Sequence, residues 1–82
     1  FTMKWGLDQT SIGETTRSVS FTYAFTNACR NVMIVGRSVG DADWNNTVPQ
    51  LVSMSPSYFT YFNQGTTGAI TNQGIFWFAV GD

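Results

Sequence analysis

The segment Gly74–Gly81 constrains the fold more than any other part of the sequence. It holds six consecutive apolar residues between two glycines. Ile, Phe, Trp and Val favour a pleated backbone, and six residues is the length of a strand rather than of a helix. Alternate side chains of a strand point to opposite faces. One face therefore consists of Ile75, Trp77 and Ala79, and the other of Phe76, Phe78 and Val80. Both faces are apolar, so we expect both to be covered.

The length of the chain limits what its own core can cover. Its 82 residues make one domain, residues 1–82, and a domain of this size buries only about 60% of its unfolded surface. Cys29 is the only cysteine, so no disulfide can form within the chain. Histidine is absent, so a zinc site is not expected, and we expect no other metal and no cofactor. Association with further copies of the chain is the remaining source of burial.

Alternating polarity predicts five further strands and no helix of useful length. They cover Met3–Leu7, Arg17–Phe25, Asn31–Gly40, Pro49–Met54 and Tyr58–Asn63. In the second of these, Val19, Phe21, Tyr23 and Phe25 are expected to face inward together. The third resembles the final strand, because it is apolar on both sides. Six strands without helices predict an all-β fold, a small antiparallel β-sandwich.

The strand order predicts different chemistry at the two ends of the sandwich. If successive strands reverse direction, the loops 8–16, 40–47 and 64–73 gather at the end opposite the N-terminus. The short turns 26–30 and 55–57 then lie near the N-terminus. The longer loops are polar, and such loops commonly carry binding residues. We therefore expect a binding surface at the far end.

The sequence lacks the residues that several classes of function require. Without histidine, the common general base and the Ser-His and Cys-His pairs are missing, so we expect no enzyme activity. Asp41, Asp43 and Asn45 begin like a calcium loop, but Asn46 and Val52 stand where that loop needs Gly and Glu. The net charge of −1 has no basic stripe with it, which argues against a nucleic-acid partner. No apolar run approaches the length of a membrane span, so we expect no membrane insertion.

The loop around Trp44 is the best candidate for recognition. An indole offers a flat apolar platform to the C–H face of a sugar, and Asp and Asn side chains bond its hydroxyl groups. The alternative is that Trp44 folds back as a lid over the core. The candidate binding residues are Asp41, Asp43, Trp44, Asn45 and Asn46, with Gln64, Asn72 and Gln73 extending the same end.

Four short segments give the sequence a family resemblance. They are Lys4-Trp5-Gly6, Val19-Ser20-Phe21 continuing through Phe25-Thr26-Asn27-Ala28-Cys29, Ser57-Tyr58-Phe59-Thr60, and Phe76-Trp77-Phe78-Ala79-Val80-Gly81. In this order they resemble the gp53-like C-terminal domain of phage tail fibre proteins. One departure is Tyr58, which stands where that pattern usually has Gly. The matched positions lie on strands, so the resemblance transfers no receptor-contacting residue.

The resemblance implies a homotrimeric β-sandwich at the distal end of a tail fibre, in the virion, made in the bacterial cytoplasm. Such a tip binds a receptor on the host surface, either a glycan such as lipopolysaccharide or an outer-membrane protein. We accordingly expect the chain to be the end piece of a longer one. A structural trimerisation cap without receptor contacts is the alternative. Trimer contacts are expected from Val32, Met33, Ile34, Val35, Ile75, Phe76, Trp77 and Phe78.

Overall fold

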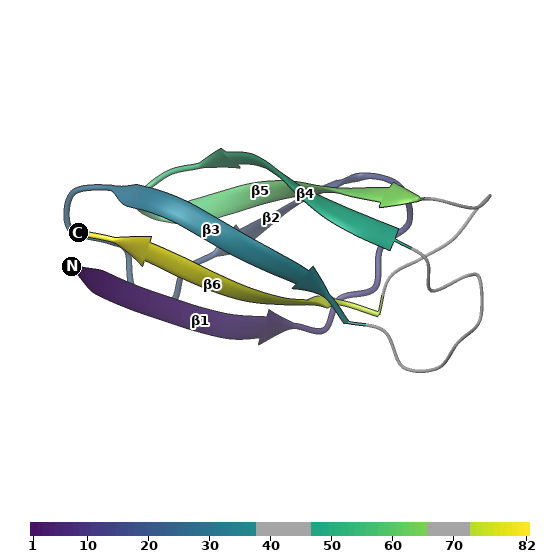
Figure 1. Cartoon of the computed structure of the whole chain (residues 1–82), viewed down its shortest axis with the longest axis horizontal. Helices are drawn as coiled ribbons and strands as arrows, with labels where there is room; N and C mark the ends of the chain where they lie inside the picture. Colours follow the sequence, from purple (N-terminus) through teal and green to yellow (C-terminus); the bar gives the residue numbers. More distant parts are fainter. Residues whose placement is uncertain (38–46, 66–72) are drawn as a thin grey trace.

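The computed structural model describes residues 1–37, 47–65 and 73–82, which form two facing three-stranded sheets (Figure 1). The strands are β1 (Thr2–Asp8), β2 (Thr16–Ser20), β3 (Cys29–Gly36), β4 (Thr47–Met54), β5 (Tyr58–Gly65) and β6 (Ile75–Gly81). Sheet A has the order β1-β6-β3 and sheet B the order β2-β5-β4, and every pairing is antiparallel. The predicted all-β fold of six antiparallel strands is confirmed. No helix long and apolar enough to cross a membrane occurs among the residues described.

The core lies between the two sheets and is rich in aromatic rings. Trp77 of β6 packs against Phe21 and Phe59, with ring centroids 5.4 and 5.6 Å apart. Ile75 and Ala79, on the same face of β6, are fully buried. This face of the final strand is therefore the inner one. The other buried apolar residues are Val19, Phe25, Cys29, Val32 and Tyr61.

The second predicted strand, Arg17–Phe25, is wrong beyond Ser20. Phe21 and Phe25 are buried as expected, but their backbone N–H groups donate to the carbonyls of Ser57 and Pro56 at 2.9 and 2.8 Å. After Ser20 the chain therefore no longer pairs with β5 as a strand. It crosses the end of the sandwich, held by these two bonds to the turn before β5. As a result Tyr23, which alternation places inward, is 78% exposed.

Smaller differences concern where other strands begin and end. The third strand starts at Cys29, with a register shift between Cys29 and Asn31, and stops at Gly36. The predicted continuation through residues 38–40 falls outside the described residues. The fifth strand runs on to Gly65, so Gln64 belongs to a strand and not to the loop assigned from sequence.

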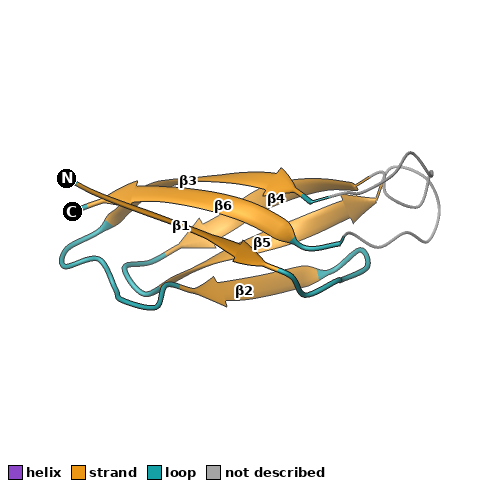
Figure 2. Cartoon of the chain, turned by 90° about the horizontal axis from the view of Figure 1, so that it is seen from below, coloured by secondary structure: helices purple, strands orange, loops and turns teal. Residues whose placement is uncertain are grey.

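The two ends of the sandwich carry different connections, as the alternating direction of successive strands predicts. Both chain termini lie at one end, on the left of Figure 1. The last residues of β1, β3 and β5 and the first residues of β2, β4 and β6 lie at the opposite end, the far end (Figure 2). The connections between these strand pairs therefore start and finish at the far end, away from the termini.

The sandwich is closed along one side and open along the other. β3 and β4 belong to different sheets but lie in close contact. β1 and β2, at the opposite edges, make no comparable contact, and within the described residues each pairs with a single neighbouring strand. Two strand edges therefore flank a gap in the wall of the sandwich, and the side chains beside it decide what it can accept.

Candidate functional site

Most of the predicted receptor-binding residues fall outside the described part of the chain. These are Asp41, Asp43, Trp44, Asn45, Asn46 and Asn72. Gln64 and Gln73 are described, and both lie at the far end. Gln64 pairs in register with Val48 of β4, and its side-chain amide donates to the carbonyl of Gly65 at 2.9 Å. The N–H of Gln73 donates to the carbonyl of Arg37, so this glutamine lies beside sheet A and Gln64 lies in sheet B.

The outer face of sheet A is almost entirely apolar. Residues opposite one another in the register share a face, which places three rows of side chains on the outside of this sheet. The nine positions are Met3, Trp5 and Leu7 on β1, Phe76, Phe78 and Val80 on β6, and Asn31, Met33 and Val35 on β3. Trp5 is 71% exposed and stacks on Phe78 with ring centroids 6.4 Å apart. Asn31 is the single polar residue of this face, which we call the apolar face.

The residues expected at a trimer contact divide between the two sides of sheet A. Val32 and Ile75 are buried in the core of the single chain, and Ile34 and Trp77 pack against that core. In this structure Val32 and Ile75 have no surface to offer a second copy, and Ile34 and Trp77 point away from the outer side of sheet A. Met33, Val35, Phe76 and Phe78 lie on the apolar face. The sequence pattern could not show which side of the strands is the inner one.

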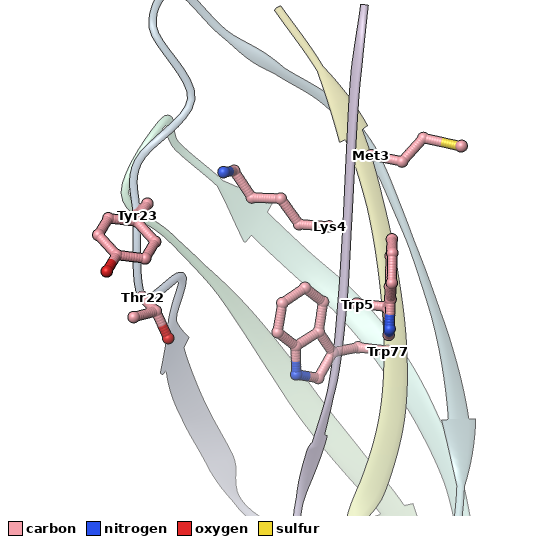
Figure 3. Close-up of a pocket in the computed structure, with 6 residues that line it drawn as sticks. All are labelled: Met3, Lys4, Trp5, Thr22, Tyr23 and Trp77. Carbon is pink, nitrogen blue, oxygen red and sulfur yellow. The ribbon is translucent and has the colours of Figure 1, made fainter.

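A groove lies in the gap between β1 and β2, and we call it the β1–β2 groove. Its first part has a volume of about 260 Å³ and is lined by Met3, Lys4, Trp5, Thr22, Tyr23 and Trp77. Figure 3 shows Lys4 and Trp77 extending from sheet A toward Thr22 and Tyr23, while Met3 and Trp5 project to the other side of β1. The side chains that face this part of the groove therefore supply the rings of Tyr23 and Trp77, the hydroxyl groups of Thr22 and Tyr23, and the ammonium group of Lys4.

The groove continues toward the far end past hydroxyl groups and an ion pair. This second part, of about 470 Å³, shares Trp5, Thr22 and Trp77 with the first and adds Ser18, Ser20, Asp8 and Arg17 among others. Arg17 Nε donates to Asp8 Oδ2 at 2.7 Å. Burial alone would raise the pKa of Asp8, but hydrogen bonds from Arg17 and Thr10 outweigh it and hold that pKa below its ordinary value. The charge of Arg17 is therefore already matched.

Comparison with known proteins identifies the family. A model of the C-terminal domain of the putative tail fibre protein gp53-like matches residues 2–82, nearly the whole chain. The chain belongs to this family. Neither the curated proteins nor the solved structures gave a match. The resemblance found in the sequence is thereby confirmed. As a member of this family, the gp53-like domain is a C-terminal domain of a phage tail fibre and a component of the virion.

Two segments that carry the family resemblance meet at the end near the termini of the gp53-like domain. The N–H groups of Asn27 and Ala28 donate to the carbonyl of Asp82, and the N–H of Asp82 donates back to Ala28. A side chain at Gly81 would collide with the carbonyl of Ala28 and the ring of Phe25. The Asn-Ala-Cys segment and the final glycine of the family pattern thus form one interlocked unit.

Two further family residues, Gly6 and Cys29, also have structural roles. A Cβ at Gly6 would stand 2.7 Å from Cζ2 of Trp77, so only glycine lets the indole lie beneath β1. Cys29 is buried, and burial raises the pKa of its thiol, which keeps it protonated and unreactive. Gly6 and Cys29 thus maintain the fold of the gp53-like domain, and neither is a candidate binding residue.

Sequence reasoning missed the residues of the groove and half of the apolar face. Lys4, Thr22 and Tyr23 are distant from Trp77 in sequence and form no motif with it. One sequence feature points to the groove. Gly6 leaves space on β1, and the bulky Trp77 of the neighbouring strand β6 fills it. Met3, Trp5 and Leu7 alternate along the predicted strand Met3–Leu7, but nothing in the pattern shows that they join the outer side of β6.

Proposed function

We propose that this gp53-like domain is the homotrimeric tip of a phage tail fibre, that it lies at the distal end of the fibre, and that it binds a receptor on the bacterial surface. The receptor is a surface glycan such as lipopolysaccharide or an outer-membrane protein. Binding involves no catalysis, no metal and no cofactor. The observation that carries the proposal is the polarity of the sandwich. Its termini lie at one end, and its three longer connections start and finish at the other.

The apolar face supports assembly. A soluble single copy rarely keeps a contiguous surface of this kind exposed to water, and here it includes Phe76, half exposed, beside Leu7 and Val35. Three copies whose apolar faces converge on a common axis would remove these side chains from water. The outer face of sheet B, where Ser18 and Thr60 share a hydrogen bond of 3.0 Å, would then face solvent.

The polarity of the sandwich supports recognition at the far end. A fibre that enters the domain through its N-terminal end leaves the far end pointing toward the host. The segments 38–46 and 66–72, which carry Trp44 and Asn72, join strands at this end. In a trimer three such surfaces act together, so that each single contact can be weak.

Two measurements test the proposal. The first is the mass of the domain in solution, which is expected to be three times that of the chain. The second is adsorption of the fluorescently labelled domain to host cells, compared with a variant in which residues 41–46 are replaced by Gly and Ser and with the single substitution Trp44→Ala. Both variants are expected to remain trimeric and to lose cell binding. Unchanged cell binding in both would contradict the placement of the receptor site at the far end.

The apolar face also favours a second function, a trimerisation cap that holds three fibre chains in register without touching a receptor. This alternative predicts the same mass in solution. It differs in adsorption, because a cap would allow all three far-end connections to be exchanged with no change in adsorption of the whole fibre. The cell-binding measurement therefore separates the two functions.

A further inference from the structure

We infer that the β1–β2 groove is a saccharide-binding site that takes a sugar unit carrying an acidic group, a carboxylate or a phosphate. This inference rests on the proposed function, since it assigns the receptor to the glycan class. It differs in location, because the groove lies on the flank of the sandwich and not at the far end.

The position of Tyr23 is the first argument. Tyr23 is exposed although the residues on either side of its segment, Phe21 and Phe25, are buried and pack edge to face with ring centroids 5.1 Å apart. Backbone hydrogen bonds to Ser57 and Pro56 fix both anchors. The ring of Tyr23 is thus held in water on a segment secured at both ends. Because the backbone on both sides of Tyr23 is anchored, only the two side-chain torsions of this residue need to be ordered when a ligand binds, which keeps the entropy cost low.

Trp77 supplies the second aromatic surface. Phe21 and Phe59 pack against its indole within the sandwich, and Gly6 leaves room for it beneath β1. In Figure 3 the ring extends into the groove toward Thr22, with Tyr23 across the gap. The indole N–H forms no hydrogen bond to a described residue and remains available as a donor. Two ring surfaces on opposite walls suit the apolar C–H faces of a pyranose, and the nearby hydroxyl group of Thr22 suits its hydroxyls.

Lys4 selects an acidic sugar. Its ammonium group lies 4.9 Å from the centre of the Phe25 ring and has no carboxylate partner among the described residues. Figure 3 shows this group extending over the groove on the same side as Tyr23. Arg17, the other cation of the groove, is paired with Asp8, so Lys4 alone offers an unmatched positive charge. A carboxylate or phosphate on the bound sugar would supply the missing partner through a charge-assisted hydrogen bond from Lys4 Nζ.

The test is a titration of the ¹⁵N-labelled domain with three probes: glucose, glucuronic acid and glucose 6-phosphate. The readout is the NMR signal of the Trp77 indole N–H, assigned by its loss in Trp77→Phe. Dissociation constants for single sugar units are expected on the order of millimolar. We expect one or both acidic probes to shift this signal and to bind about tenfold more tightly than glucose.

Matched variants separate the site from a general effect on the surface. Tyr23→Ala and Lys4→Gln are expected to weaken binding of the acidic probe about tenfold, and Lys4→Gln is expected to leave glucose binding unchanged. Tyr58→Ala removes an exposed ring from the opposite sheet, and Arg30→Gln removes an exposed positive charge near the C-terminus. Both controls are expected to bind as the parent does. Thermal unfolding checks that each variant is folded.

Three outcomes would overturn the inference. They are the absence of any shift at Trp77 with all three probes, equal binding of glucose and the acidic probes, and a change of mass in solution on Tyr23→Ala or Lys4→Gln. The last would make the groove a contact between copies. If the parent domain adsorbs to cells and these variants adsorb equally well, the groove inference fails while the proposed function stands. If the parent does not adsorb, the proposed function fails whatever the probes do.

Discussion

The indole of Trp77 lies directly beneath Gly6, so close that a Cβ on Gly6 would stand between 2.7 and 3.0 Å from three of its atoms. The indole cannot withdraw, because Phe21 and Phe59 pack against it inside the sandwich. Gly6→Ala is therefore expected to lower the free energy of unfolding by about 1–3 kcal/mol, as overpacking does. Urea denaturation measures the effect. Gly36→Ala is the control, since the nearest described atom would be 3.7 Å away, and a loss equal to that of Gly6→Ala would contradict the explanation.

The ion pair of Asp8 and Arg17 makes stability depend on pH. The folded-state pKa of Asp8 is lowered, so its stabilising contribution is complete above the unfolded pKa of about 3.9 and is lost as pH falls through the folded value. Asp8→Asn is expected to cost about 1 kcal/mol at neutral pH, since the pair is partly exposed. The difference from the parent should shrink below about pH 4.

Chemical denaturation at pH 2 to 7 tests this expectation. Glu14→Gln, which removes an exposed carboxylate from the same connection, serves as the control and should follow the parent at every pH. A difference between Asp8→Asn and the parent that stays constant down to pH 2 would show that the carboxylate charge is not what matters.

Asn63 fastens the connection between β1 and β2 to sheet B. It is fully buried, and its side-chain amide donates to the carbonyls of Ile12 and Gly13 at 3.2 and 3.1 Å. Asn63→Asp removes both donors and places a carboxylate beside two carbonyls, so we expect it to destabilise the fold by about 3 kcal/mol or more. Asn63→Ala should cost about 1–3 kcal/mol. Asn27→Asp, at an exposed position, controls for the added charge, and thermal unfolding of the three variants ranks them.

The stacked pair Trp5 and Phe78 provides the sharpest test of the apolar face. If this face joins the copies, Trp5→Ser and Phe78→Ser should each raise the dissociation constant of the assembly at least tenfold. Val52→Ser, on the exposed strand β4, is the control and should leave assembly unchanged. Analytical ultracentrifugation over a range of concentrations gives the constants. Assembly of normal strength in both aromatic variants would mean that the copies meet through another surface.

The strands could be predicted because their signal is local. The alternation of Ile75 with Phe76 and of Trp77 with Phe78 needs no knowledge of the rest of the chain, and these residues lie on opposite faces of β6 as predicted. Which face is the inner one depends on the pairing of β6 with β1 and β3, distant in sequence. The expected trimer contacts therefore mixed core residues such as Ile75 with surface residues such as Phe76.

The error at Tyr23 has a physical cause. Phe21 and Phe25 repeat at even spacing, as in a strand, but the chain buries them by turning toward Ser57 and Pro56. An alternating pattern cannot distinguish a straight strand from two buried anchors with an exposed arch between them. The β1–β2 groove was hidden for the same reason, because Tyr23, Lys4 and Trp77 come together only after that turn.

The order β1-β6-β3 sets a sequence of events during synthesis. Sheet B has all its members once Gly65 has been made, whereas β1 and β3 must wait for the strand that separates them. Until β6 leaves the ribosome, β1 and β3 have no strand to pair with in sheet A, and their apolar side chains stay exposed to water. A chain that lacks β6 would have a complete sheet B but leave β1 and β3 without their shared partner, so the solubility of the folding chain depends on β6.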